Sequence, residues 1–357
     1  MKMLPIKYRK CSTGFSLVEL MIAITLGIIL VTSVLNVFLN NKLLINAEVS
    51  LSRIQESGRL VMELFTKDLR KVGYHGCSNP ADMNIIVMAA SGVNADFGAT
   101  SLRGFEVGSG GTFTPTLDGA DSLIVIQGSG SQKARVGSDV LQIKYADRIG
   151  AKLTSSTDPV NTSFQVDSNP SLVQNDIVIV SDCQSAHIFA ITNNPASSGT
   201  ITIEHAASNN SPHKMLPGYA SGADLLSYRD VTYFVADTGR NNGNSDVYSL
   251  YRKFSTSDTL EELVEGVEFL QVLYGEKLAS GNIRFVSAGT AGLSMQAVVA
   301  IKVAVLVQDF DVGQIGDDNR TYSLLNTAIA SSGSIAHSGG RYLRKPFSAT
   351  VQLRNAR

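Results

Sequence analysis

The sequence predicts an α+β fold, in which a long N-terminal helix precedes a β-rich antiparallel globular domain. An apolar run covers residues 15–39, and a segment with the apolar spacing of an amphipathic helix follows over residues 40–72. Beyond residue 73 the chain carries short β-branched runs that are separated by Gly, Asn, Asp and Ser. Strands that cluster after a helix, instead of alternating with helices, are typical of an antiparallel sheet.

The apolar run is long enough to cross a membrane. It extends from Phe15 to Leu39, and Glu19 is its only charged residue. As a helix it would be about 37 Å long, which exceeds the roughly 30 Å of a hydrocarbon core. Its Leu, Ile, Val and Phe residues favour insertion by about 5–10 kcal/mol, against about 3 kcal/mol for one central acid. Four basic residues at positions 2, 7, 9 and 10 precede the run, so the positive-inside rule places the N-terminus in the cytoplasm.

A cleaved secretory signal is the alternative interpretation of a basic start and an apolar run. Such a signal has an apolar region of only about 7–15 residues and a small-residue cleavage site after it. Here the run is longer, and residues 40–72 continue it with apolar positions on one face and charged positions on the other. This segment contains no Pro, and Gly58 is its only Gly. We therefore expect one nearly continuous helix from about Phe15 to about Val72.

The stretch TGFSLVELMIAITLGIILV at residues 13–31 resembles the class III signal of type IV prepilins and pseudopilins. The resemblance implies a leader peptide of residues 1–14 that prepilin peptidase removes between Gly14 and Phe15. It also implies that Phe15 is N-methylated and that Glu19 is a buried carboxylate used in subunit assembly. A lone carboxylate in lipid is unfavourable unless it is paired, and the new α-amino group at Phe15 of a neighbouring subunit is a suitable cation. The alternative for Glu19 is a carboxylate that reaches the membrane interface.

Four later motifs narrow the resemblance to the PilW type of minor pilin: KDLRKVGYHGC, IVIVSDCQSAHIFAIT, LVEGVEFLQVLYG and FSATVQLRN. The expected partners are then prepilin peptidase, other minor pilins, the major pilin, the inner-membrane pilus assembly platform and inner-membrane lipid. The expected location is the bacterial inner membrane, crossed once, with a periplasmic domain and incorporation into the pilus. One departure is that the helix-kinking Pro of many major pilins is absent, with Ser33 and Asn36 near its place. Glu19 is present, whereas the tip-capping pseudopilin of related secretion systems lacks this acid.

The region after the helix is predicted to form one globular domain over residues 73–357, with one or two sheets. The expected strands are 121–128, 139–147, 176–183, 186–192, 200–207, 230–237, 246–254, 267–275, 296–308 and 348–355. The Asn242–Gly243 pair indicates a hairpin turn, and Leu260–Val264 has a trace of helical spacing. Gly-, Ser-, Thr- and Asn-rich stretches at 92–120, 148–163 and 312–340 are expected to be surface loops.

Two cysteines remain after the leader, because Cys11 lies within it. In an oxidising periplasm, Cys77 and Cys183 are expected to form a disulfide. The bridge would close a loop of about 107 residues and contribute up to about 4.7 kcal/mol in the chain-entropy model. The alternatives are free thiols or a zinc site, in which His75 and His187 would complete a Cys₂His₂ set.

The sequence favours a structural protein over an enzyme. It contains no G-x-S-x-G, P-loop or H-E-x-x-H motif, and no cofactor is expected. Its five His residues are scattered and are expected to be structural or surface groups, and residues 237–246 form a polar turn more readily than a calcium loop. Lys and Arg number 30 against 31 Asp and Glu, so no nucleic-acid partner is expected.

We therefore expect a minor pilin that takes part in type IV pilus assembly, within an initiating or tip-proximal minor-pilin complex. Two alternatives stay open at this point. One is a pilus-borne adhesin or ligand-binding module, whose long loops would hold the ligand. The other is a pseudopilin of a type II-like secretion system.

Overall fold

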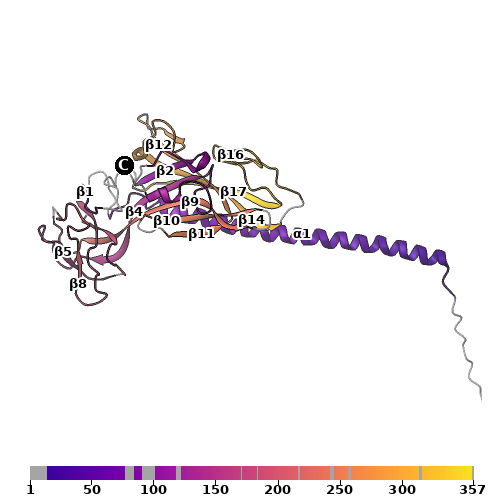
Figure 1. Ribbon diagram of the computed structural model, residues 1–357, viewed down its shortest axis with the longest axis horizontal. Helices are drawn as coiled ribbons and strands as arrows, with labels where there is room; N and C mark the ends of the chain where they lie inside the picture. The colour runs from indigo at the N-terminus through magenta and orange to yellow at the C-terminus, as the bar shows by residue number, and fades with distance from the viewer. Residues whose placement is uncertain are drawn as a thin grey trace, which may run out of the picture.

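The N-terminal helix α1 runs without interruption from Leu17 to Leu69, which confirms the predicted helix within three residues at each end. The structure is a computed structural model that describes residues 14–76, 84–90, 101–117, 122–169, 171–182, 184–215, 218–241, 245–255, 259–312 and 316–355. The N-terminal half of α1 projects away from the β-rich region, whereas its C-terminal half lies along that region (Figure 1). A helix of 53 residues is about 80 Å long, so the projecting part can carry a membrane-spanning segment.

Two antiparallel sheets form the body of the β-rich region. The larger sheet has the order β1-β7-β6-β9-β4-β2-β3, and β10 pairs with both β9 and β11. Its strands are β1 (Asn84–Val87), β2 (Leu102–Val107), β3 (Phe113–Thr114), β4 (Asp139–Lys152), β6 (Ile177–Ser181), β7 (Ser185–Ala190), β9 (Asp224–Asn241), β10 (Asp246–Phe254) and β11 (Leu260–Glu265). The pair of β1 and β7 is parallel, and the other pairs of this sheet are antiparallel.

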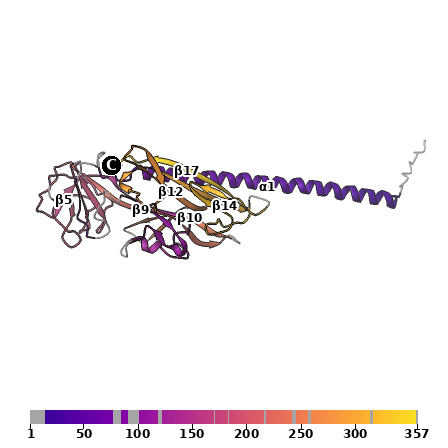
Figure 2. The same ribbon diagram turned by 90° about the horizontal axis from the view of Figure 1, so that it is seen from above.

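The smaller sheet has the order β13-β12-β14-β17 and supports the helix. Its strands are β12 (Val267–Lys277), β13 (Ile283–Val286), β14 (Val298–Val312) and β17 (Tyr342–Gln352). The C-terminal half of α1 packs against β14 and β17, and also approaches β11. The view from above shows α1 running alongside this sheet and beyond it (Figure 2). Two short ribbons complete the strands, β5 (Ser163–Val166) with β8 (Ile201–Glu204) and β15 (Tyr322–Leu324) with β16 (Thr327–Ile329).

The main hydrophobic core lies between the helix and the two sheets. The helix contributes Ile54, Val61, Phe65 and Leu69, which recur at intervals of seven, four and four residues and therefore share one face. Strands β4, β9 and β10 of the larger sheet and β12, β14 and β17 of the smaller sheet supply most of the other side chains. Burying each of the larger side chains contributes about 1.5–3 kcal/mol, so this stripe anchors the helix to the sheets.

A second core, which we call the distal lobe, is built from residues between Met88 and Leu225 around β5, β6, β7 and β8. Strands β5 and β8 lie at the end of the molecule opposite to the projecting start of α1 (Figure 1). The lobe is therefore the part of the described chain farthest from the segment expected in the membrane.

Several sequence predictions were wrong in detail. Residues 121–128 were expected to form a strand, but Ser122–Ile126 form the 3-10 helix η3, because Leu123 and Ile126 are buried while Ile124 and Val125 between them are exposed. The trace of helical spacing at Leu260–Val264 does not correspond to a helix: these residues belong to β11, whose Glu261 forms an ion pair with Arg252 of β10.

The predicted surface loops were also partly wrong. The stretch 92–120 holds β2, β3 and the 3-10 helix η2 (Ser109–Gly111), β4 continues to Lys152, and 312–340 holds β15 and β16. A further 3-10 helix, η4 (Met295–Ala297), precedes β14. The turn residues Asn242 and Gly243 lie outside the described residues, but β9 and β10 on either side pair as the hairpin prediction requires.

Candidate assembly site

The predicted processing and assembly residues lie together at the projecting end of α1. Gly14 and Phe15 precede the helix in non-helical backbone, and the Phe15 side chain is 81% exposed. Ser16 has an extended conformation and its carbonyl accepts the Leu20 amide at 3.1 Å, which begins the helix. Glu19 lies in the first turn, where the positive end of the helix dipole favours a carboxylate. The geometry leaves the Gly14–Phe15 bond accessible to a peptidase.

The N-terminal half of α1 has the properties of a lipid-facing helix. All residues from 17 to 42 are exposed, and among the described residues α1 is the helix that is long and apolar enough to cross a membrane. The hydroxyls of Thr25, Thr32 and Ser33 donate to backbone carbonyls of the same helix at 2.8–2.9 Å. These polar groups therefore need no partner from lipid, as a spanning helix requires.

Glu19 differs from those hydroxyl groups. Within the described part of the chain, its carboxylate has no hydrogen bond or ion pair. It is also the only acid between Phe15 and Leu39. In lipid, a carboxylate needs a partner, and the described chain does not supply one.

The other half of α1 is fixed to the domain by polar as well as apolar contacts. The buried carboxylate of Asp68 accepts a hydrogen bond from the Tyr233 hydroxyl of β9. The Tyr233 ring also packs edge-on against Phe65, with ring centroids 5.2 Å apart. At the other end of the chain, the Asn355 side chain donates to the carbonyl of Val72 at 3.1 Å. These contacts hold the C-terminal half of α1 against the β domain.

The chain that leaves the helix runs onto the larger sheet. The amide of Gly73 donates to the Lys144 carbonyl of β4, and His75 is buried with its Nδ1 2.8 Å from the Gly73 carbonyl oxygen. A Cβ atom on Gly76 would lie 2.8 Å from Oγ of Ser181 in β6, so these two segments are in contact. This contact places the residue before Cys77 against the strand that precedes Cys183.

Neither cysteine is among the described residues, so the pairing of Cys77 with Cys183 and the zinc alternative both remain predictions. Of the two His residues in the zinc alternative, His187 is fully buried and its Nδ1 is hydrogen-bonded to the Tyr219 hydroxyl at 2.5 Å. Within the described residues, no group of three or more His, Cys, Asp or Glu side chains is placed to hold a metal ion.

A buried ionic cluster that the sequence analysis did not anticipate holds the C-terminal strands. Arg344 of β17 is fully buried and donates to Oε2 of Glu268 at 2.7 Å and to Oδ2 of Asp318 at 3.1 Å. It also donates to the Gln308 side chain and to the Gly339 carbonyl, each at 2.7 Å. Such satisfied networks fix one arrangement of the chain, because removing one partner leaves a buried charge without compensation.

The pKa values of these acids are lowered, as expected of paired carboxylates. Burial alone would raise the pKa of Glu268, but the charges of Arg344 and Arg135 outweigh burial and hold it below its ordinary value. For Asp318, burial likewise opposes the shift, and hydrogen bonds from Arg320, Tyr322 and Arg344 lower the pKa to about 2. The cluster is therefore charged at neutral pH.

A second pair of acids behaves in the opposite way. Glu106 of β2 lies opposite Asp139 of β4 in the antiparallel register, and Asp139 is almost fully buried. Burial raises the pKa of both groups, and the negative charge of Glu106 raises that of Asp139 further. Oδ2 of Asp139 accepts the Val272 amide at 2.7 Å, whereas Oδ1 of Asp139 and Oε1 of Glu106 have no hydrogen-bond partner in the described structure. The pair joins the larger sheet to β12 of the smaller one.

A projecting apolar helix with a single acid near its start, fixed to an antiparallel β domain, defines the class of pilin-like proteins. Residues 9–35 match a family model described as "Prokaryotic N-terminal methylation motif". Residues 232–355 match a second family model, described as "Type IV Pilus-assembly protein W". Together the two matches confirm the resemblance and support a type IV minor pilin of the PilW type. No curated protein and no solved structure gives a significant match to the chain.

The two matches cover different parts of the structure. The first contains Gly14, Phe15 and Glu19, and the second runs from β9 to the end of β17 and contains the Arg344 cluster. The distal lobe lies outside both matches. The two matches therefore cover the start of α1 and the C-terminal strands, among them β14 and β17, which pack against the helix.

Proposed function

We propose that this protein is a minor pilin that takes part in type IV pilus assembly, within an initiating or tip-proximal complex of minor pilins. The observation that carries the proposal is the free apolar half of α1, with Glu19 as its only charge and no partner for it in the described chain. An unpaired carboxylate on a lipid-facing helix is stabilised by a cation from another subunit, so the helix is suited to lateral assembly.

The proposed sequence of events begins in the inner membrane. Residues 1–14 are a leader that prepilin peptidase removes, residues 15–39 span the membrane and residues 40–72 form the amphipathic half of the helix. Residues 73–357 form a periplasmic domain. The new α-amino group at Phe15, once N-methylated, pairs with the Glu19 carboxylate of an adjacent pilin. The assembly platform then moves the complex outward as major pilin subunits are added below it.

The placement of the distal lobe supports a second candidate function. This lobe has its own core, lies opposite to the membrane-facing end of α1 and falls outside both family matches. In a subunit near the pilus tip, the lobe would face outward and be available to bind a ligand on another surface. The protein would then combine a shared assembly helix with a separate binding module.

The proposal is tested by replacing Glu19 with Gln, which keeps the shape of the side chain and removes its charge. Membrane insertion should persist, because a neutral amide is less unfavourable in lipid than an ionised acid. Co-purification with other pilins and recovery in sheared pili should fall. The matched control is Glu48→Gln, which removes an exposed acid from the same helix outside its apolar half. A Glu19→Gln variant that enters pili as efficiently as the unmodified protein would contradict the proposed role.

A further inference from the structure

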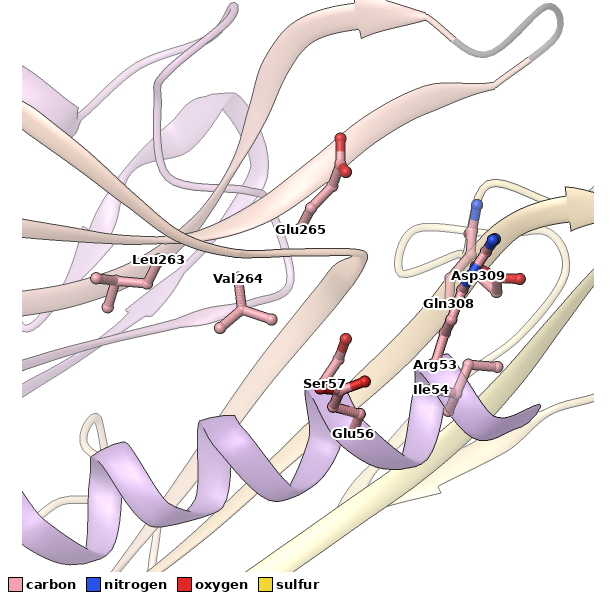
Figure 3. Close-up of a pocket in the computed structure, with 9 residues that line it drawn as sticks. All are labelled: Arg53, Ile54, Glu56, Ser57, Leu263, Val264, Glu265, Gln308 and Asp309. Carbon is pink, nitrogen blue, oxygen red and sulfur yellow. The ribbon is translucent and has the colours of Figure 1, made fainter. Parts of the chain in front are cut away.

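A polar groove lies where α1 enters the β domain. Its volume is about 440 Å³, and it is bounded by three segments that are far apart in the chain. The lining residues come from α1, from the end of β11 and from β14 (Figure 3): Arg53, Ile54, Glu56, Ser57, Leu263, Val264, Glu265, Gln308 and Asp309. The groove thus lies beside the helix that carries the assembly residues, but on the domain side.

Asp309 is the unusual residue of this groove. Its side chain is only 6% exposed, and its Oδ1 lies 3.9 Å from Nη1 of Arg53, which is too long for a hydrogen bond. Its Oδ2 is buried and has no hydrogen-bond partner in the described structure. A buried carboxylate is unfavourable unless it is paired and hydrogen-bonded, so this oxygen indicates a donor that the chain itself does not provide.

The charges around Asp309 show what kind of donor would fit. Glu56 and Glu265 also line the groove, whereas Arg53 is the basic residue in the lining. Nη2 of Arg240 lies 2.8 Å from Oε1 of Glu265, so this guanidinium compensates part of the negative charge of the lining. The lining therefore carries three carboxylates and one guanidinium, and a positively charged donor complements it.

A metal ion and a lipid headgroup are both poorer occupants than a protein side chain. Among the described residues, no group of three His, Cys, Asp or Glu side chains is arranged to hold a metal ion. The groove begins at Arg53, 14 residues beyond Leu39, which along a helix is about 21 Å past the expected end of the membrane segment. The headgroup layer extends only about 5–8 Å beyond the hydrocarbon core, so it does not reach Arg53.

We propose that this groove receives a Lys or Arg side chain from a neighbouring pilin subunit, which donates to Oδ2 of Asp309. The inference rests on the proposed function, because it requires that subunits pack side by side. It adds a second contact, at the base of the β domain, to the contact between Glu19 and a neighbouring N-terminus. Two ionic contacts on one subunit, about 50 Å apart along α1, fix the register of neighbours better than one.

The test uses a photo-crosslinker beside the groove in the full-length protein in cells. Ser52 is exposed and lies one helical turn before Glu56, on the same face. With p-benzoylphenylalanine at position 52, irradiation should join the protein to another pilin, and mass spectrometry should identify a joined peptide that contains Lys or Arg. Asp309→Asn should lower the yield about tenfold, which corresponds to about 1.4 kcal/mol, because hydrogen bonds to charged groups are stronger than those to neutral ones. Replacing the identified basic residue by Gln should lower it equally, with no further loss in the double variant.

Two further variants distinguish this result from damage to the fold. Glu56→Gln changes an exposed helix residue and should give a smaller fall in the yield, whereas Asp317→Asn, an exposed acid outside the groove lining, should give none. Provided that the protein is still recovered in pili, any of three results would overturn the inference. These are an unchanged crosslinking yield in Asp309→Asn, a crosslinked peptide without Lys or Arg, and crosslinking to lipid. Absence of the protein from pili and from all pilin complexes would overturn the proposed function together with it.

Discussion

The ring of Phe347 in β17 lies directly over the backbone of Gly58 in α1. A Cβ atom on Gly58 would be 2.6 Å from Cζ of Phe347, which is well inside van der Waals contact. Gly58 is the only Gly between residues 40 and 72, and it lies in the buried stripe between Ile54 and Val61. The contact explains why a residue that weakens helices by about 1 kcal/mol occupies the middle of α1.

We expect Gly58→Val to lower the free energy of unfolding by about 1–3 kcal/mol, because overpacking displaces the Phe347 ring and β17 with it. In a Phe347→Ala background the same change should be much less destabilising, since the space above position 58 is then open. Denaturant unfolding followed by tyrosine near-UV circular dichroism would measure both, as the chain has no Trp. Equal losses in the two backgrounds would show that the ring is not what excludes a side chain.

The sequence was sufficient to predict the elements whose patterns are long. The helix and the strands β4, β9, β12 and β14 have enough apolar residues with a clear period to be recognised without tertiary information. Short apolar runs were not sufficient to predict the secondary structure of their residues. The LIVI run of Ser122–Ile126 has only four apolar residues, and its 3-10 form depends on which of them the neighbouring strands cover. Residues 260–264 form a strand by pairing with β10, and this pairing with a strand that lies earlier in the chain is not visible in so short a pattern.

The candidate site likewise has one part that the sequence predicts and another that it does not. Gly14, Phe15 and Glu19 form a motif within six residues, so the sequence alone places them together. The Arg344 cluster combines side chains from residues 268, 308, 318 and 344, and Asp309 meets Arg53 from 256 residues earlier in the chain. No spacing in the sequence indicates such contacts, because tertiary packing alone brings the groups together.

Processing is tested at Gly14. We expect Gly14→Val to block removal of the leader, because prepilin peptidases require a small residue before the cut, as the family resemblance implies. The intact mass of the membrane-extracted protein should then remain that of the full-length chain. The control is Gly27→Val, which introduces the same side chain into the exposed apolar half of α1 without changing the cleavage sequence. A mature chain beginning at Phe15 in the Gly14→Val variant would refute the assigned cleavage site.

The cysteines are tested by peptide mapping. The contact of Gly76 with Ser181 supports a Cys77–Cys183 disulfide, since these residues precede the two cysteines by one and two positions. Mapping of the membrane-extracted protein without reduction should therefore give one linked peptide pair, and Cys77→Ser should leave Cys183 free to be alkylated. Reduction should lower the free energy of unfolding by about 2–5 kcal/mol. Two alkylatable thiols together with one bound zinc per chain would instead favour the metal alternative.

The buried acids Glu106 and Asp139 predict a pH dependence whose sign differs from that of the Arg344 cluster. Because burial raises both of their pKa values, the folded protein binds protons to this pair more tightly than the unfolded chain. Stability from the pair is therefore greatest below the ordinary carboxyl range and falls as pH rises toward the raised pKa values. Glu268 and Asp318 have lowered pKa values, so they stabilise the fold above the ordinary range and lose this effect as pH falls.

The Asp139→Asn variant separates the pH dependence that comes from the Glu106–Asp139 pair from that of Glu268 and Asp318. The Asn carbonyl can still accept the Val272 amide, and its NH₂ group can donate to the Glu106 carboxylate, so the variant keeps the hydrogen bond and removes the repulsion. We expect the variant to be more stable than the unmodified protein at about pH 8 and to gain little at about pH 4, where both acids are largely protonated. Denaturant unfolding at a series of pH values gives the measurement, with Asp317→Asn as the control that removes an exposed acid. If Asp139→Asn shifted stability equally at every pH, the carboxyl pair would not be the group that titrates.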